Sequence, residues 1–282
     1  MRPRRREWTS NIESSRGEAQ NREAADPATH NSDPRSALGW ILHPSVARNL
    51  GDSPSIADFA TGTGLFLRSL STSYPGARLD GYDISPAMFV SDNNVTLSVA
   101  NAKEPLPAEL HGVYDVVHIR YLIAGMEPDD WQLVLLNMLQ LLKPGGAIQW
   151  EEPALSQVQH LRGEPSSTTA TMTRMSLMFR SGVLQQRFSQ GWSTLPAIME
   201  KCGLRVETDV VSSDRVVDTR RALTENGLVA LLGFARMLAA KQAPGAISTA
   251  QIQEMEGAAI REIESGCYVR YDVHTAIGFK PN

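Results

Sequence analysis

The chain has 282 residues, 42% of them hydrophobic and 21% charged, which is enough for one well-cored domain of about 240 residues and a tail. Its net charge of −4 argues against a nucleic acid as the main partner, and no apolar run approaches the ~18 residues of a membrane span. Two cysteines, Cys202 and Cys267, are too few for a disulfide framework, so we expect a cytoplasmic protein. They also lack metal-ligand spacing, so we expect no metal site. Because no apolar run is long enough to span a membrane, we expect no membrane partner.

Residues 1–34 differ in composition from the rest of the chain. They open with the basic run Met1–Arg6 and continue with polar residues, and they hold almost nothing to bury, so we expect a disordered tail. Recurrent acids such as Glu7 and Glu13 do not fit a mitochondrial presequence. Nuclear localisation through the arginine cluster is the alternative to a solvated tail.

The next third of the chain alternates between strand and helix patterns. Helical spacing over 37–50 is broken at Pro44. A helix is predicted over 63–71, and Ser85-Pro86 starts another, with serine as the N-cap and proline at the first helical position. Three apolar or alternating runs predict strands: 55–59, 78–82 and 95–99.

The remaining residues continue this alternation. A buried strand over 113–119 precedes a helix that starts at Asp129-Asp130 and stops at Pro144-Gly145-Gly146. Residues 154–201 read as helical. Further strands are predicted over 147–151, 204–210 and 269–279, and two helices over 220–240 and 248–264. Strands that alternate with helices indicate an α/β, doubly wound, mostly parallel sheet, formed by one domain over 35–282.

A turn of small residues follows the first strand. Ala60, Gly62 and Gly64 allow backbone N–H groups to approach a ligand closely where the strand becomes a helix. Asp83 ends the next strand, where a ribose diol would lie. The dinucleotide fingerprint needs glycine at 60, 62 and 65, and the chain has Ala60 and Leu65, so NAD is disfavoured.

This pattern resembles motif I of class I S-adenosylmethionine-dependent methyltransferases. The likeness continues in the family's order through Tyr82-Asp83-Ile84, Asn101-Ala102 and the turn 142–146. Three further stretches are similar to small-molecule methyltransferases of fungal secondary metabolism: 39–44, 118–122 and 149–152. The resemblance covers roughly 39–155. It implies a Rossmann-like, seven-stranded sheet with an antiparallel last strand.

The resemblance also implies roles for particular residues. Asp83 and Ile84 would bind the ribose and flank the adenine, and Asn101-Ala102 would lie beside the adenine. Asn101 replaces the family's usual aspartate, and Ala60 its first glycine; both changes are mild, since Asn still accepts a hydrogen bond and alanine is small. The methionine part of the cofactor would be held by the motif I residues Asp58, Ala60, Thr61, Gly62 and Gly64.

Catalysis is the least defined part of this interpretation. Methyl transfer from a sulfonium needs an in-line approach in a dry pocket more than it needs a protein base. A hydroxyl acceptor benefits from a base, for which His118 and Glu151 are the candidates. The alternatives are a hydrogen-bonded structural histidine and a structural salt bridge. Helix residues 172–179, rich in methionine, would line the acceptor site within a helical cover around 156–200, or pack in a core.

The sequence therefore predicts an S-adenosylmethionine-dependent methyltransferase that acts on a small, largely apolar natural product. O-methylation is slightly favoured over N- or S-methylation. Two alternatives stay open: a methyltransferase-like regulator of secondary metabolism, and a cofactor-bound catalyst of a non-methylating rearrangement. The oligomeric state is left open.

Overall fold

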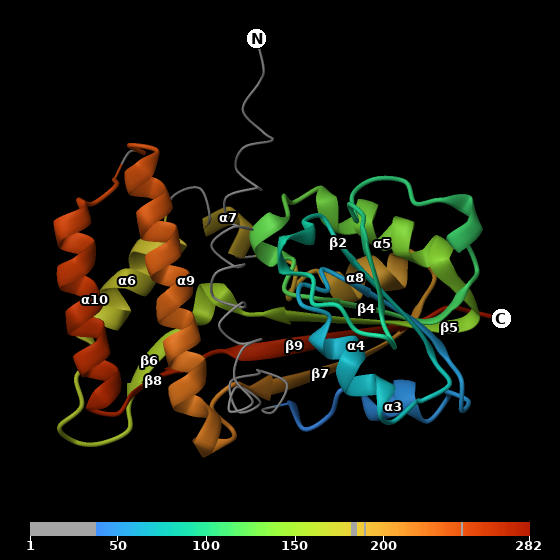
Figure 1. Ribbon diagram of the computed structural model, residues 1–282, viewed down its shortest axis with the longest axis horizontal. Helices are drawn as coiled ribbons and strands as arrows, with labels where there is room; N and C mark the ends of the chain where they lie inside the picture. The colour runs from blue at the N-terminus through green and yellow to red at the C-terminus, as the bar shows by residue number, and fades with distance from the viewer. Residues whose placement is uncertain (1–37, 182–184, 189, 244) are drawn as a thin grey trace, which may run out of the picture. The chain divides into compact units, whose positions relative to one another are not determined.

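The computed structural model describes residues 38–181, 185–188, 190–243 and 245–282 (Figure 1). The predicted tail, 1–34, lies outside them. The described residues form two compact units. Residues 40–154, 186–210 and 273–282 make up the first, which we call the sheet unit, and most of the remainder, 155–185 and 211–272, makes up the second, the helical unit. Each unit is described by itself.

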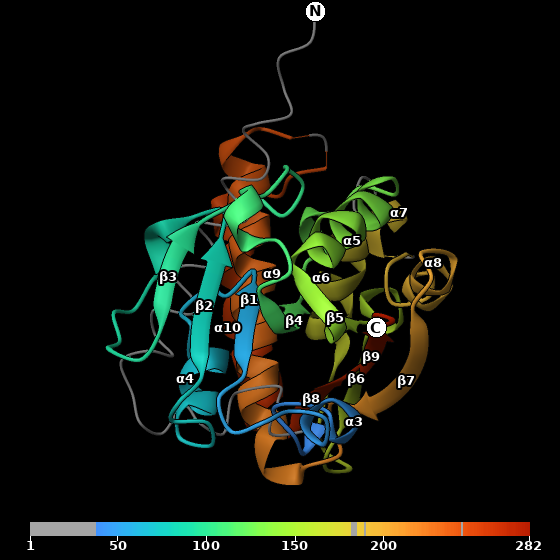
Figure 2. The same cartoon turned by 90° about the vertical axis from the view of Figure 1, so that its right-hand side faces the viewer.

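The sheet unit is built on a seven-stranded sheet in the order β3-β2-β1-β4-β5-β9-β7 (Figure 2). β1 pairs in parallel with β2 and β4, β2 with β3, and β4 with β5, whereas β9 is antiparallel to β5. This confirms the predicted doubly wound, mostly parallel sheet with an antiparallel last strand. The strands are β1 (Ser55–Phe59), β2 (Arg78–Asp83), β3 (Thr96–Val99), β4 (Tyr114–Arg120), β5 (Leu142–Pro153), β7 (Arg205–Ser212) and β9 (Asp272–Phe279).

Helices cover both faces of this sheet (Figure 1). On one face, α3 (Pro44–Ala47) and α4 (Leu65–Ser71) bury Val46, Phe66, Leu67 and other apolar residues against β1 and β2. On the other, α5 (Asp130–Leu141) packs on β4 and β5, with α8 (Leu195–Lys201) against it. The rings of Trp131 and Trp150 meet there, 5.6 Å apart. The sheet is therefore buried on both faces, as its apolar strands predict.

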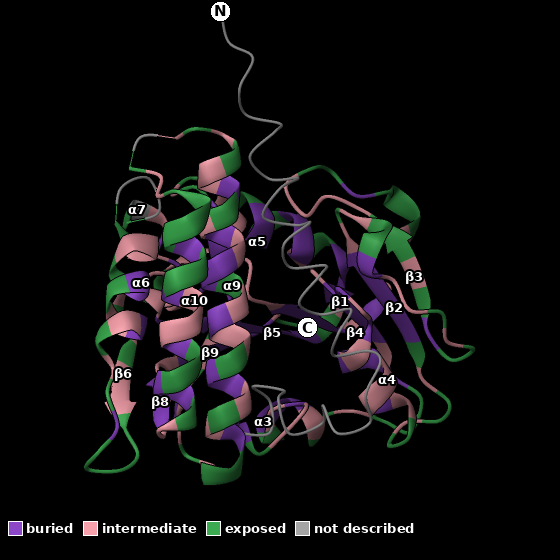
Figure 3. Cartoon of the chain, turned by 60° about the vertical axis from the view of Figure 1, so that its left-hand side comes forward, coloured by how far each residue is buried: buried purple, intermediate pink, exposed green. Residues whose placement is uncertain are grey.

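The edge strand β3 differs from the centre of the sheet. β1 is almost fully buried and β2 nearly so, whereas β3 is largely exposed (Figure 3). Short 3-10 turns, not full helices, follow β2 and β3: η2 (Pro86–Met88) and η3 (Ala108–Leu110). The helix predicted to start at Ser85-Pro86 is thus wrong beyond its first turn, although Ser85 does accept the N–H of Ala87 at 3.3 Å as predicted for a cap. The apolar residues 87–90 are followed at once by the polar run Ser91–Asn94, which favours a turn over a longer helix.

The helical unit packs α6 (Ala170–Arg180), α9 (Arg220–Ala240) and α10 (Thr249–Glu264) around a core that includes Met172, Leu228 and Ile252. The buried carboxylate of Glu262 on α10 accepts the N–H groups of Thr171 and Met172, both at 2.9 Å, and so caps the start of α6. By length and composition alone, the described segment Val217–Ala240 is apolar enough to cross a membrane. In the helical unit it contributes Leu228, Leu231 and Leu232 to the core, although most of the segment is not buried.

Two predictions fail in this part of the chain. Residues 154–201 are not continuously helical, because β6 (Gln159–Arg162) pairs antiparallel with β8 (Cys267–Arg270) in a separate two-stranded sheet. The alternating run 269–279 is likewise not one strand: β8 ends at Arg270 and β9 begins at Asp272. Pairing across some 100 residues leaves no local signal.

Candidate functional site

The strand register brings the predicted cofactor residues to one edge of the sheet. Phe59 at the end of β1 is paired with Tyr82 on one side and Ile119 on the other, and Asp83 is paired with Val99. The residues that follow these strand ends are therefore neighbours. They include Ala60, Ile84, Asn101 and Tyr121, so the carboxyl edge expected to bind ligands does collect the motifs.

The turn after β1 has an unusual backbone. Ala60, Gly62 and Gly64 have φ values of 59°, 55° and 76°, and Gly64 forms the N-cap of α4. The left-handed region suits glycine, and it costs alanine more, so Ala60 is held there by its surroundings. Thr61 donates its backbone N–H to Tyr82 at 3.1 Å, which fixes the turn against β2. Three left-handed residues in alternation turn the backbone sharply between strand and helix.

Asp83 holds this turn from the neighbouring strand. One oxygen of its carboxylate accepts the N–H of Gly62 at 2.9 Å, and the other accepts that of Ser85 at 3.1 Å. The side chain is half-buried. Each carboxylate oxygen has two acceptor positions, so both oxygens keep one for a further donor. Asp83 is thus a loop cap that retains the capacity to bind two hydroxyl groups.

The predicted adenine residues lie beside Asp83. Ala100 donates its N–H to the carbonyl of Asp83 at 2.9 Å, which places the loop that begins at Asn101 next to it. Ile84 is a large apolar side chain that is 42% exposed at this edge of the sheet. The side chain of Asn101 organises its own loop: Oδ1 accepts the N–H of Lys103 at 3.0 Å, and Nδ2 donates to Glu104 at 3.2 Å.

Beneath the turn lies a buried network centred on His118. Its Nδ1 faces Asp58 Oδ1 at 2.7 Å, and its Nε2 lies 3.8 Å from Glu151 Oε1. The imidazole stacks on the ring of Phe66, with centroids 3.7 Å apart and an interplanar angle of 11°. The other oxygen of Asp58 accepts the hydroxyl of Thr61 at 2.7 Å. The network therefore runs from β5 through β4 and β1 into the turn itself.

The charges in this network support one another. Burial opposes the charged imidazole, but hydrogen bonds and attraction from Asp58 and Glu151 outweigh it and raise the pKa of His118. Burial also opposes the ionised Glu151, and His118 again outweighs it and lowers the pKa of that carboxyl. The position of the ring between Asp58 and Glu151 thus favours the protonated imidazole. Gln149 completes the set by donating to Glu151 at 2.7 Å.

This geometry bears directly on the catalytic candidates. His118 is 1% exposed and Glu151 is fully buried, and both point into the network. A general base must come within hydrogen-bond reach of the acceptor, and no surface of either side chain is open for that. Their role as a base stays a prediction, and their burial argues against it. The geometry favours the structural alternative.

The segment after β4 begins at Tyr121, within the stretch 118–122 that resembles small-molecule methyltransferases and is expected beside the acceptor. Tyr121 has a φ of 58°, and the backbone N–H groups of Leu122 and Ile123 donate to the carboxylate of Glu152 at 2.9 and 3.2 Å. Trp150 also donates its indole N–H to Glu152, at 2.8 Å. Of the glutamate pair on β5, Glu151 therefore serves the cofactor side, and Glu152 holds the segment where an acceptor is expected. Alternation along a strand predicts this division.

Residues 172–179 belong to the helical unit. Met172 and Met175 are buried in its core, whereas Leu177 is 55% exposed. For the two methionines the core-packing alternative therefore holds. That the surrounding region covers an acceptor stays a prediction.

Comparison with known proteins shows which proteins this chain is similar to. Residues 57–148 match the model of a family described as methyltransferase domain. This match supports a class I S-adenosylmethionine-dependent methyltransferase domain over that stretch of the chain. The matched residues hold the turn after β1, Asp83, Asn101 and His118, so the family match falls on the site itself.

Two curated relatives come from fungi. Methyltransferase grgD of Penicillium sp is 40% identical over 107 residues, which are 34% of this chain and 38% of that protein. N-methyltransferase gliN of Aspergillus fumigatus is 30% identical over 150 residues, 51% of each chain. The matches thus span only about two fifths to one half of these relatives.

A solved structure extends the likeness over the whole chain. One chain from the complex of the Haloferax volcanii Trm112 methyltransferase activator with a methyltransferase has a TM-score of 0.51. It is 16% identical and the match covers 96% of this chain and 98% of that one. At this identity the likeness concerns the fold alone.

The residues of the sheet unit fit the family's cofactor, S-adenosylmethionine. Asp83 keeps two free acceptor positions, which suit the two hydroxyl groups of a ribose. The exposed face of Ile84 suits an adenine ring, and Asn101 and Ala102 lie half-buried beside it. The described residues contain no group of three or more His, Cys, Asp or Glu that would hold a metal ion.

Proposed function

We propose that this protein is a methyltransferase that transfers a methyl group from S-adenosylmethionine to a small, largely apolar natural product. The observation that carries the proposal is the shared edge of the sheet: the turn 60–64, Asp83-Ile84 and Asn101-Ala102 lie side by side at the carboxyl ends of three paired strands. The names of the fungal relatives, both methyltransferases, support the transfer of a methyl group.

The roles of the residues follow from their contacts. When bound, S-adenosylmethionine supplies a methyl group on a positively charged sulfur, which is already a strong electrophile. Asp83 would accept hydrogen bonds from the ribose, and Ile84 with Asn101-Ala102 would flank the adenine. Asp58, Thr61 and the backbone of 60–64 would hold the methionine part. The buried ring of His118 contacts Asp58, which in turn accepts the hydroxyl of Thr61 in the turn.

We place an amine nitrogen ahead of a hydroxyl oxygen as the acceptor atom, which revises the preference drawn from the sequence. An uncharged amine carries a nucleophilic lone pair and needs no protein base, whereas a hydroxyl benefits from one. The two side chains expected to act as a base are buried in the network beneath the turn. The relative gliN is named an N-methyltransferase, which supports the same choice.

The test uses matched pairs of apolar aromatic compounds that differ only in carrying a secondary amine or a hydroxyl group. Each is incubated with the protein and S-adenosylmethionine bearing a deuterated methyl group, and products are weighed by mass spectrometry. We expect label in the amine member of a pair. Label only in hydroxyl members would contradict the choice of acceptor atom.

Binding measurements with S-adenosylmethionine and NAD separate the remaining alternatives. Tight binding of S-adenosylmethionine without any methylated product supports the regulator, and an unlabelled isomer of the substrate supports the rearrangement catalyst. Binding of NAD in preference to S-adenosylmethionine would overturn the proposed function itself.

A further inference from the structure

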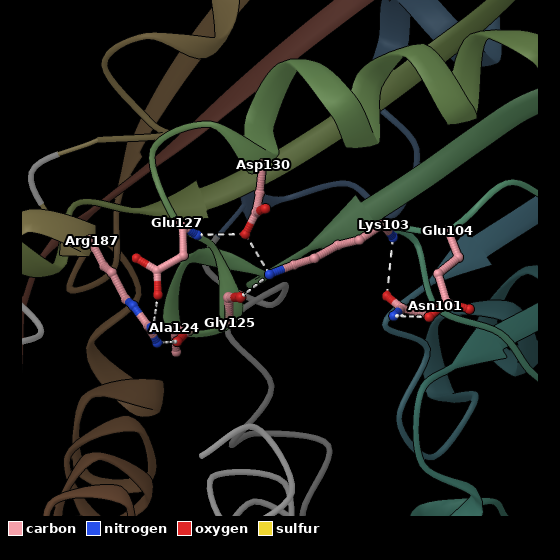
Figure 4. A network of polar contacts seen from close by, with 8 residues as sticks. All are labelled: Asn101, Lys103, Glu104, Ala124, Gly125, Glu127, Asp130 and Arg187. Atoms are coloured by element: carbon pink, nitrogen blue, oxygen red, sulfur yellow. Dashed lines mark hydrogen bonds and ion pairs between the residues drawn. The ribbon is translucent and has the colours of Figure 1, made fainter. Parts of the chain in front are cut away.

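Lys103 joins the predicted adenine loop, 101–104, to the segment after β4, 122–130 (Figure 4). The ammonium of Lys103 donates to the carbonyl of Gly125 at 2.6 Å and forms an ion pair with Asp130. The lysine side chain is 30% exposed and that of Asp130 only 19%. A pair that is partly removed from water is screened less than a surface ion pair, so this contact holds its two segments more firmly than an exposed one would.

On one side of Lys103 lies the loop 101–104. Its turn is closed by the N–H of Glu104, which donates to the carbonyl of Asn101 at 3.0 Å. Asn137 on α5 donates to the carbonyls of Ala102 and Glu104, at 2.9 and 3.1 Å. Asn101 and Lys103 therefore belong to one closed turn that is also held by α5.

On the other side lies the segment 122–130, which contains η4 (Ile123–Gly125). Asp130 accepts the N–H of Glu127 at 2.7 Å as well as the ammonium of Lys103. Arg187 on α7 (Gln185–Phe188) donates to the carbonyl of Ala124 at 3.0 Å and forms an ion pair with Glu127 (Figure 4).

The contacts of this segment come from three separate places in the chain. Glu152 holds its first two N–H groups, Arg187 its middle and Lys103 its end. Short 3-10 turns are weakly stabilised by their own hydrogen bonds, so such outside contacts set the position of the backbone. Of the three, only Lys103 comes from the predicted cofactor loop.

We infer that Lys103 is a positioning residue that couples the cofactor loop to the acceptor side of the site. Because coupling is reciprocal, a cofactor that orders Asn101-Ala102 also orders 122–130, and an acceptor bound there strengthens cofactor binding by the same factor. The acceptor then binds best to the protein that already holds the cofactor. This inference rests on the proposed function, since it takes 100–104 as part of the cofactor site.

Hydrogen exchange with S-adenosylhomocysteine as the probe tests the coupling without knowledge of the acceptor. In the unaltered protein, saturation with the probe should slow amide exchange at least about fivefold both in 100–104 and in 122–130. Lys103→Met keeps the aliphatic stem and loses the ammonium. In this variant the probe should still slow amide exchange in 100–104, but it should slow exchange in 122–130 less than about twofold. Lys103→Arg, which keeps charge and donors, should restore it.

Lys143→Met is the matched control. Lys143 also pairs with an aspartate, Asp115 at 2.8 Å, with side chains that are 40% and 31% exposed, but it lies at the start of β5, away from this edge of the sheet. It should behave like the unaltered protein. Thermal unfolding of each variant without the probe shows whether it is folded.

The outcomes separate the inference from the function beneath it. Two results would overturn the coupling alone. In the first, the probe still slows amide exchange of 122–130 in Lys103→Met. In the second, the probe slows exchange of 100–104 but not of 122–130 in the unaltered protein. Failure of the probe to bind or to slow exchange at 100–104 in the unaltered protein would instead overturn the proposed cofactor site.

Discussion

At the scale of single residues, Asp83 carries two tasks at once. Its carboxylate caps the turn after β1 through Gly62 and begins the next loop through Ser85. The same two oxygens are those we assign to the ribose. The structure shows the first task, and the second stays a prediction. Loss of the side chain therefore affects both the empty protein and its complex.

We predict that Asp83→Ala weakens binding of S-adenosylmethionine at least about tenfold, since one lost charge-assisted hydrogen bond is worth about 1.5–3 kcal/mol. It should also lower the free energy of unfolding by about 1–3 kcal/mol, because two N–H groups lose their acceptor. Titration calorimetry and denaturant unfolding measure the two effects. Asp92→Ala removes a loop aspartate that accepts one N–H, from Asn94 at 2.8 Å, and is the control. Unchanged affinity in Asp83→Ala would contradict the assigned site.

For His118 the sequence left two roles open, a base and a hydrogen-bonded structural histidine, and its contacts favour the second. A histidine at the end of a strand beside a cofactor motif suggests a base, whereas the structure makes it the centre of a buried network. The partners Asp58 and Glu151 lie 60 and 33 residues away in the sequence, on different strands. Only the register of the sheet shows that their carboxylates face the same ring.

The pKa shifts of this network predict a pH dependence. A raised folded-state pKa means that the stability due to charged His118 is complete below its ordinary value of 6.5 and is lost as pH rises above it. The free energy of unfolding should fall from pH 6.5 upward, with a contribution from this group of at most about 1.4 kcal/mol per pH unit. His118→Gln should lack that contribution.

The measurement is denaturant unfolding across this pH range, with His111→Gln as the control, because the ring of His111 faces a backbone carbonyl, that of Leu106 at 3.3 Å. The lowered pKa of Glu151 acts in the opposite range: its contribution is present above 4.5 and is lost as pH falls. If the free energy of unfolding changes equally with pH above 6.5 in the unaltered protein and in His118→Gln, the protonated imidazole does not stabilise the fold.

At the scale of elements, the sequence predicts best what local pattern determines. The strands around the motifs, α5 with its start at Asp130, and α10 with its capping box at Ser248 all lie close to their predicted places. The missed elements depend on distant partners: β6 is a strand because it pairs with β8, and η2 stays short because nothing extends it. The same reasoning explains the site. Its loops could be predicted, and the contacts of Lys103 and Arg187 could not.

A glycine between α7 and α8 is another long-range requirement. Gly191 has a φ of 80°, and a Cβ atom there would lie 2.2 Å from the ring of Trp131 on α5. We predict that Gly191→Ala lowers the free energy of unfolding by about 2–5 kcal/mol, from backbone strain and overpacking together.

Gly203→Ala is the matched control. Gly203 has a φ of 84°, and a Cβ atom there would meet nothing within 4 Å, so its cost should be the strain alone, about 1–2 kcal/mol. Denaturant unfolding of both variants gives the difference. A Gly191→Ala protein no less stable than Gly203→Ala would show that Trp131 yields without cost.

At the scale of the whole molecule, the two units are interleaved along the chain. The helical unit contributes the segment between β5 and α7 and the segment between β7 and β9. Both β7 and β9 contain residues assigned to each unit. Neither unit is a continuous stretch of sequence, so the strands that close the sheet can form only when the chain between them has folded back. This connectivity favours unfolding in one cooperative step.

We therefore predict that S-adenosylhomocysteine raises the melting temperature of both units together. The four tryptophans of the described residues lie in the sheet unit, so their fluorescence follows that unit, whereas the long helices α9 and α10 give circular dichroism at 222 nm a strong contribution from the helical unit. At 100 times its dissociation constant, a ligand that binds only the folded state adds about 2.7 kcal/mol. For a chain of this size that corresponds to a shift of about 5–10 °C in both signals.

NAD at the same concentration is the control and should shift neither. A shift in fluorescence alone would mean that the sheet unit holds the cofactor and unfolds independently, and that the helical unit gains no stability from it.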